Sequence, residues 1–91
     1  MKATKIKMKA SSQNSNQLTE IDSIYIEGCK EPRFYKKEGL HDYVKENPGS
    51  IKVNINPYPS LIPATSVNNE KYVKSEANSI VEDNLLKLPR E

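Results

Sequence analysis

The chain has 91 residues, the size of one small domain, and only 35% of them are hydrophobic. Its mean hydropathy is −0.77, and no apolar run reaches the ~18 residues of a membrane span. The only cysteine is Cys29, so an intramolecular disulfide, on which small secreted domains usually depend, is excluded. We therefore expect a single folded domain over residues 1–91, located in a reducing cytoplasm.

The net charge is +2, and it is concentrated at the N-terminus, where residues 1–19 carry four lysines and no acid. In residues 4–10, Ile6 and Met8 alternate with lysines, which is the two-residue period of a half-buried strand. The lysines would line the solvent face of that strand and discourage aggregation. A nucleic-acid contact and a disordered basic tail are the alternatives. The polar residues 11–17 that follow predict a flexible loop.

Three further strands are predicted. Residues 21–27 alternate in the same way and would pair with the first strand, and residues 50–56 give the clearest alternation of all. A short strand over 70–74 and a loop over 76–83 come later. Residues 57–63, between the strands predicted over 50–56 and 70–74, contain three prolines and are expected to stay outside any sheet interior.

One helix is predicted over residues 34–46, where Leu40, Tyr43 and Val44 form an apolar stripe. Pro48 and Gly49 would end it. The side chains expected to face water are Lys36, Lys37, His41, Asp42, Lys45 and Glu46.

The resulting order β-β-α-β-β predicts an α+β domain, with a mainly antiparallel sheet of three or four strands and one helix on one face. The chain is poor in large apolar side chains, yet residues 84–89 hold Leu85, Leu86 and Leu88. We expect this cluster to fold back and complete the core. The alternative is an exposed docking strip or a homodimer contact.

The segment Tyr72-Val-Lys-Ser75, followed by Asp83-Asn-Leu-Leu-Lys-Leu-Pro89, resembles the closing signature of bacterial domain-of-unknown-function family 3892. Ile21-Asp-Ser-Ile24, or alternatively Ala3-Thr-Lys-Ile6, is similar to the first strand of that family, and Lys37-Glu-Gly-Leu40 is similar to its middle helix. Many family tails continue Leu-Pro-Glu-Cys, whereas Arg90 and Glu91 follow Pro89 here. Because the family has no established activity, the resemblance implies a bacterial or phage setting but no mechanism.

Catalytic residues, cofactors and metal ligands are not expected. His41 is the only histidine, and Cys29 stands beside Lys30 without the local context of a nucleophile. The three glycines are far apart, which excludes a phosphate-binding glycine loop. The sequence therefore predicts a protein that is not an enzyme.

Aromatic and basic residues mix between Tyr25 and Lys37, and this pattern is typical of contact surfaces. The predicted function is that of an accessory protein that acts by protein–protein interaction, as a monomer or weak homodimer and without membrane contact. Nucleic-acid binding by the lysine-rich first strand and the Arg33–Lys37 region is the alternative. The candidate interaction surface comprises Lys5, Lys7, Lys9, Arg33, Tyr35, Lys36, Lys37, Tyr58, Tyr72 and Lys74.

Overall fold

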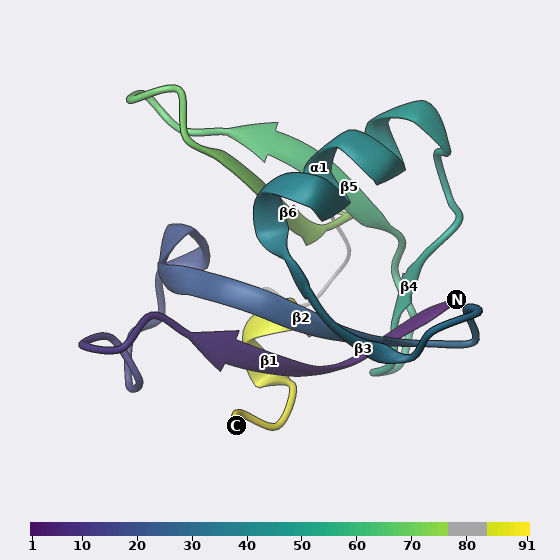
Figure 1. Cartoon of the computed structure of the whole chain (residues 1–91), viewed down its shortest axis with the longest axis horizontal. Helices are drawn as coiled ribbons and strands as arrows, with labels where there is room; N and C mark the ends of the chain where they lie inside the picture. The colour runs from purple at the N-terminus through teal and green to yellow at the C-terminus, as the bar shows by residue number, and fades with distance from the viewer. Residues whose placement is uncertain (77–83) are drawn as a thin grey trace.

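The structure is a computed structural model that describes residues 1–76 and 84–91. These residues form six strands, one α-helix and two short 3-10 helices (Figure 1). In chain order the elements are β1 (Lys2–Met8), η1 (Leu18–Glu20), β2 (Ile21–Glu27), β3 (Arg33–Lys36), α1 (Lys37–Glu46), β4 (Lys52–Val53), β5 (Leu61–Thr65), β6 (Lys71–Ser75) and η2 (Asn84–Lys87).

Strands β1 to β4 form one sheet in the order β3-β2-β1-β4. β1 pairs antiparallel with β2, with Ile6 opposite Ile24, and β2 pairs antiparallel with β3. β4 joins the other edge of β1 in the parallel direction, so the sheet is mixed. β5 and β6 form a second, antiparallel sheet. The Leu61 N–H donates to the Ile51 carbonyl (2.8 Å) and thereby links the start of β5 to the chain before β4.

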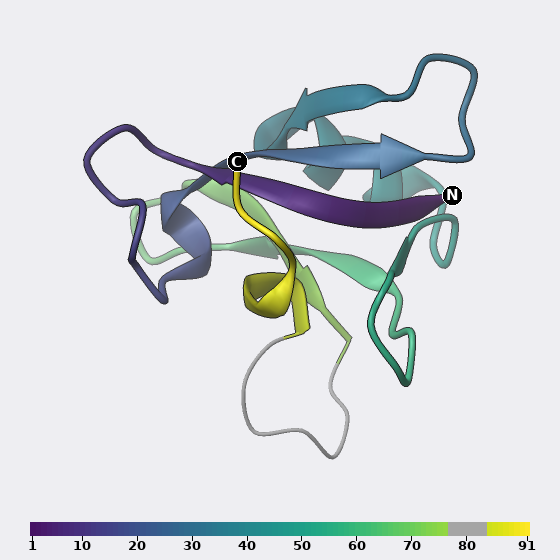
Figure 2. The same ribbon diagram turned by 90° about the horizontal axis from the view of Figure 1, so that it is seen from below.

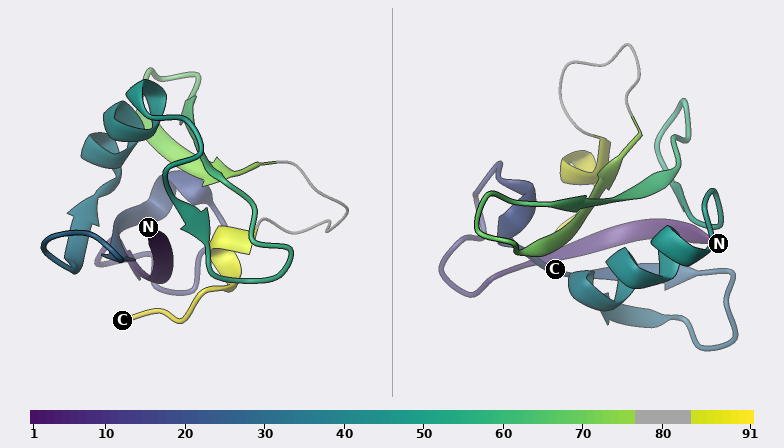
Figure 3. Two further views of the ribbon diagram at one scale, coloured as in Figure 1. Left: turned by 90° about the vertical axis from the view of Figure 1, so that its right-hand side faces the viewer. Right: turned by 90° about the horizontal axis from the view of Figure 1, so that it is seen from above.

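Helix α1 lies over the four-stranded sheet and beside the β5–β6 hairpin (Figures 1 and 3). Leu40 and Val44 are one turn apart on α1, so both point into the space between the two sheets. The buried apolar side chains form one cluster: Ala3, Ile6, Met8, Ile21, Ile24, Ile26, Leu40, Val44, Ile51, Val53, Leu61, Val73, Leu85, Leu86 and Leu88. The expectation of a small α+β domain with one α-helix is confirmed.

Strand β3 was not predicted, and the helix begins at Lys37 rather than at Phe34. Residues 33–36 pair with β2 instead, with Phe34 opposite Tyr25. Four residues are too few to reveal an alternating pattern, and the pairing partner that fixes them as a strand lies on another segment. Tertiary pairing therefore overrides the local helical pattern.

The region after the helix also differs from expectation. The strand predicted over 50–56 is reduced to the two residues of β4, while β5 forms within the proline-rich part of the chain. Pro63 lies inside β5, opposite Val73. A proline is tolerated there because β6 is the only strand partner of β5 among the described residues, so no second strand needs the backbone N–H that proline lacks. Of the loop predicted over 76–83, residues 77–83 lie outside the described part of the chain.

The leucines of the C-terminal cluster complete the core, as expected. Leu85 is fully buried, and Leu86 and Leu88 are 8% and 4% exposed. The end of the chain then reaches β1 (Figure 2), where the Ile6 N–H donates to the Pro89 carbonyl (2.9 Å) and the Glu91 N–H donates to the Ile6 carbonyl (3.0 Å). The C-terminal residues therefore pair with the same edge of β1 as β4 does, at a position further along the strand.

The burial of two helix residues and the exposure of a third correct the sequence prediction. Lys37 and His41 were expected in solvent but are only 3% and 6% exposed, whereas Tyr43 of the expected apolar stripe is 42% exposed. The buried face of α1 is therefore rotated toward Lys37 and His41. The reason is that α1 packs against both the four-stranded sheet and the β5–β6 hairpin. The pattern of apolar residues in the helix does not predict its contact with the hairpin.

Candidate functional site

An apolar pocket of about 430 Å³ lies between α1, the β2–β3 hairpin and the start of β1. We call it the helix-side pocket; its wall includes Ile26, Cys29, Tyr35, Leu40, Tyr43 and Ile51. Ile26 and Tyr35 reach it from neighbouring strands, because both belong to the face of the sheet that α1 covers. Ligand-binding cavities of proteins are typically of this size and mostly apolar.

Two features keep the helix-side pocket open. The Tyr35 hydroxyl donates to the Glu31 carbonyl (2.7 Å), which fixes the ring against the hairpin loop. Gly39 of α1 also lines the pocket, and a Cβ atom at this position would meet no atom within 4 Å. A larger residue at 39 would therefore occupy open space instead of colliding with the fold.

Basic side chains surround the pocket more than acidic ones do. The Arg33 guanidinium carbon lies 4.5 Å from the centre of the Tyr35 ring, and the nearest Arg33–Glu31 contact is a loose 3.9 Å. Lys36 pairs with Asp22 at 2.9 Å, and this hydrogen bond holds the pKa of the Asp22 carboxyl below its ordinary value. Lys30 also lines the pocket and forms no ion pair with any residue that the structure describes.

Strand β3 borders this pocket and is the terminal strand of its sheet. Within the described residues, β2 is its only strand partner. One edge of β3 therefore presents backbone groups that no strand of the described chain takes up.

The opposite face of the sheet carries a second cluster, which we call the outer sheet face: Lys5, Lys7, Tyr25 and Phe34. Lys5 of β1 is opposite Tyr25 of β2, which is opposite Phe34 of β3. The two rings meet edge to face, with centroids 5.2 Å apart and planes at 79°. The Lys5 ammonium lies 5.0 Å from the centre of the Tyr25 ring, and the Lys7 ammonium lies 5.7 Å from that of Phe34.

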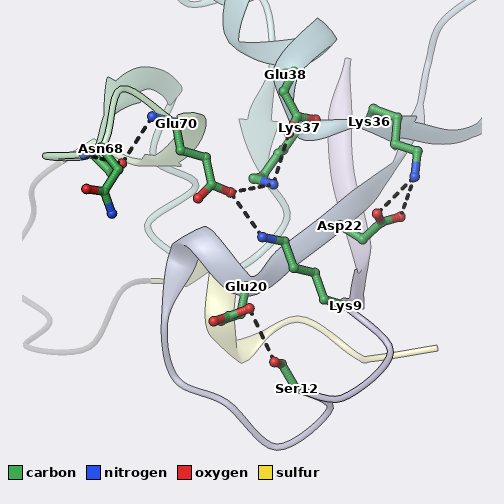
Figure 4. A network of polar contacts seen from close by, with 10 residues as sticks. Lys9, Ser12, Glu20, Asp22, Lys36, Lys37, Glu38, Asn68 and Glu70 are labelled. Atoms are coloured by element: carbon green, nitrogen blue, oxygen red, sulfur yellow. Dashed lines mark hydrogen bonds and ion pairs between the residues drawn. The ribbon is translucent and has the colours of Figure 1, made fainter.

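Lys9 and Lys37, both predicted as surface contacts, instead take part in an ion-pair network (Figure 4). The Glu70 carboxylate accepts from Lys37 (3.0 Å) and Lys9 (3.1 Å), and Lys37 also donates to Glu38 (3.1 Å). Hydrogen bonds from Lys37 and then Lys9 hold the Glu70 pKa below its ordinary value. Burial alone would lower the Lys37 pKa, but its two carboxylate partners outweigh burial and raise it. This network ties β1, α1 and the β5–β6 turn together.

The ten predicted surface residues thus fall into separate places. Lys5 and Lys7 lie on the outer sheet face, Arg33, Tyr35 and Lys36 lie around the helix-side pocket, and Lys9 and Lys37 lie in the network. Tyr72 and Lys74 belong to β6 of the second sheet. Tyr58 is exposed in the proline-rich turn, with a left-handed φ of 59°.

The pocket could not be predicted from the sequence. Its wall includes Ile26, Leu40 and Ile51, and the pattern around each of them predicts an ordinary core residue. The signal that could have found it is Gly39, an exposed glycine inside a helix that has no conformational need for one.

The isolated histidine and cysteine are each engaged locally. The Cys29 thiol donates to the Ile26 carbonyl (3.6 Å), and His41 Nδ1 is 2.9 Å from the Asp42 carboxylate. Across residues 1–76 and 84–91, no three His, Cys, Asp or Glu side chains gather as metal ligands do. In the same residues, no helix has the length and apolar character needed to cross a bilayer.

A small mixed sheet under one helix, with an apolar pocket beside an edge strand, defines a small α+β domain. A family model, described as "Protein of unknown function (DUF3892)", matches residues 2–89, and the chain belongs to this family. No curated protein and no solved structure matches it. The family resemblance read from the sequence is thereby confirmed.

Proposed function

We propose that this protein is a non-enzymatic interaction module that binds an extended peptide segment of a partner protein at strand β3. The observation that carries the proposal is the juxtaposition of an edge strand with an apolar pocket about 430 Å³ in volume. A peptide that adds to a sheet edge gains affinity from backbone hydrogen bonds and specificity from pockets that receive alternate side chains.

The pocket wall and its surroundings suggest the chemistry of the peptide. Tyr35, Leu40 and Ile51 offer an apolar surface that suits one large aliphatic or aromatic side chain. Lys30, Arg33 and Lys36 lie around it and outnumber Glu31 and Asp22, so an acidic residue next to the apolar one would be favoured. The partner segment would thus combine one large apolar residue with one or more acids.

A selection from a random-peptide phage library tests this proposal. We expect the enriched peptides to share an apolar residue beside an acid, and their binding to shift the backbone amide NMR signals of β3. The substitution Gly39→Leu should weaken or abolish binding, because Gly39 lines the pocket and a large side chain at this position would narrow it. The matched control is Gly39→Ala, which adds one methyl group, should retain binding and stabilises the helix by about 1 kcal/mol.

The proposal is wrong if no peptide family is enriched, or if the enriched peptides bind the Gly39→Leu variant as tightly as the parent protein. Thermal melts of both variants confirm that each is folded, so a loss of binding cannot be confused with a loss of structure.

The setting of this activity is part of the same proposal. We expect a bacterial or phage protein that works in the cytoplasm as a monomer or weak homodimer. The lone, half-buried Cys29 supports the reducing compartment.

A further inference from the structure

The outer sheet face brings together four side chains that are far apart in the sequence. None of the four lines the helix-side pocket. Lys5 and Lys7 come from β1, Tyr25 from β2 and Phe34 from β3. These residues lie on the side of the sheet opposite to α1, since Ile6, Ile24 and Tyr35 between them point toward the core. The outer sheet face is therefore a surface in its own right.

The arrangement separates cations from rings in a regular way. Lys5 and Lys7 are two residues apart on one strand, so their side chains are about 7 Å apart along β1. The rings lie on the two neighbouring strands, with Tyr25 opposite both Lys5 and Phe34. A chain of phosphates that followed β1 would place its attached bases over β2 and β3.

The ring geometry leaves room for a base. Tyr25 and Phe34 meet edge to face, so the edge of one ring covers one face of the other, and no ring face is covered by a stacked ring. The lysine ammonium groups lie over the rings at 5.0 and 5.7 Å, on long side chains that can turn toward a phosphate. Rings beside mobile cations are the two components of surfaces that bind single strands.

One of these two lysines already forms an ion pair with a carboxylate. The Glu91 carboxylate pairs with the Lys5 ammonium at 3.3 Å, and the Glu91 backbone is fixed to β1 by its hydrogen bond to Ile6. Both side chains of this pair are about half exposed, so a competing anion can reach Lys5. Lys7 has no ion-pair partner among the described residues.

We propose that the outer sheet face binds single-stranded nucleic acid, with phosphates at Lys5 and Lys7, bases on Tyr25 and Phe34, and Glu91 in competition for Lys5. A single strand fits better than a duplex, because duplex bases are already stacked on one another and cannot use the rings. This site lies on the opposite side of the sheet from the proposed peptide site, so either proposal can fail without the other.

Fluorescence anisotropy with a labelled oligo(dT) of about 15 nucleotides tests the proposal, starting at about 50 mM salt. We expect Phe34→Leu to weaken binding about 5- to 150-fold, because one base loses its stacking partner. The double variant Lys5→Gln/Lys7→Gln should reduce the slope of log K against log salt by about 1.4. Glu91→Gln should tighten binding, because it frees Lys5.

The matched control is Lys45→Gln/Lys87→Gln, which removes the same charge from two exposed lysines outside this face and should leave the salt slope nearly unchanged. Four results would overturn the proposal: no binding at the lowest salt, an equal loss in both double variants, no effect of Phe34→Leu, or tighter binding of a duplex of the same length. If the selected peptides, but not oligo(dT), lose affinity in Phe34→Leu, the outer sheet face belongs to a protein partner instead.

Discussion

Replacing Leu85 with alanine is expected to lower the free energy of unfolding by about 2–5 kcal/mol. Leu85 is fully buried in the single core cluster, and its backbone N–H is fixed by the Ser75 hydroxyl (3.0 Å). The backbone therefore cannot easily move inward to fill the space that the missing methyl groups leave. In a domain of this size such a loss is a large part of the total stability.

Urea denaturation followed by circular dichroism measures this effect, with the slope of the transition compared between variants. The control is Val67→Ala, since Val67 is 98% exposed and its replacement should change stability by less than about 0.5 kcal/mol. An unchanged midpoint for Leu85→Ala would show that the C-terminal cluster does not belong to the core.

The second large effect is expected for Glu70→Gln, which removes the carboxylate shared by Lys37 and Lys9. Lys37 is only 3% exposed, so its ammonium depends on Glu70 and Glu38 for the interactions that water would otherwise supply. Breaking a fully buried ion pair costs about 3–5 kcal/mol. Because Glu38 remains and the Glu70 side chain is 33% exposed, we expect a loss of about 1–3 kcal/mol.

The pH dependence of this loss distinguishes an ion pair from simple packing. The pKa of Glu70 in the folded protein lies below its ordinary 4.5. Its contribution is therefore fully present above pH 4.5 and disappears as the pH falls through the lower, folded value. The stability difference between the parent protein and Glu70→Gln should be constant near neutral pH and should shrink in acid.

Glu31→Gln provides the control for that comparison, because the only ion pair of the Glu31 side chain among the described residues is an exposed, 3.9 Å contact with Arg33. Its effect should stay below about 0.5 kcal/mol at every pH. If Glu70→Gln behaves like Glu31→Gln, Lys37 does not need the network that surrounds it.

Much of the fold could be predicted where a pattern is local and repeated. The alternation in β1 and β2 placed both strands, and the three C-terminal leucines were expected in the core because the rest of the chain offers so few large apolar side chains. β3 could not be found in this way, since its four residues become a strand only by pairing with β2. The parallel addition of β4 likewise depends on a distant partner.

The candidate sites were harder to predict, for the same physical reason. The mixture of aromatic and basic residues was visible in the sequence, but the sheet divides it between two faces: Phe34 joins Lys7 on one, and Tyr35 joins Arg33 on the other. The burial of Lys37 depends on Glu70, which is remote along the chain. Hydropathy gives a lysine the same value in solvent and in an ion-pair network, so this burial left no trace in the sequence.

The pairing of β1 has a consequence for the rate at which this protein folds. One edge of β1 is taken by β2, while the other is shared by residues 52–53 and by the segment around Arg90. The contacts of β1 with residues 52–53 and with Arg90 each close a long loop. The chain loses conformational entropy in closing each loop before the contact stabilises it. We therefore expect this small domain to fold in milliseconds to seconds, slowly for its size, with closure of the β1 edge as the late step.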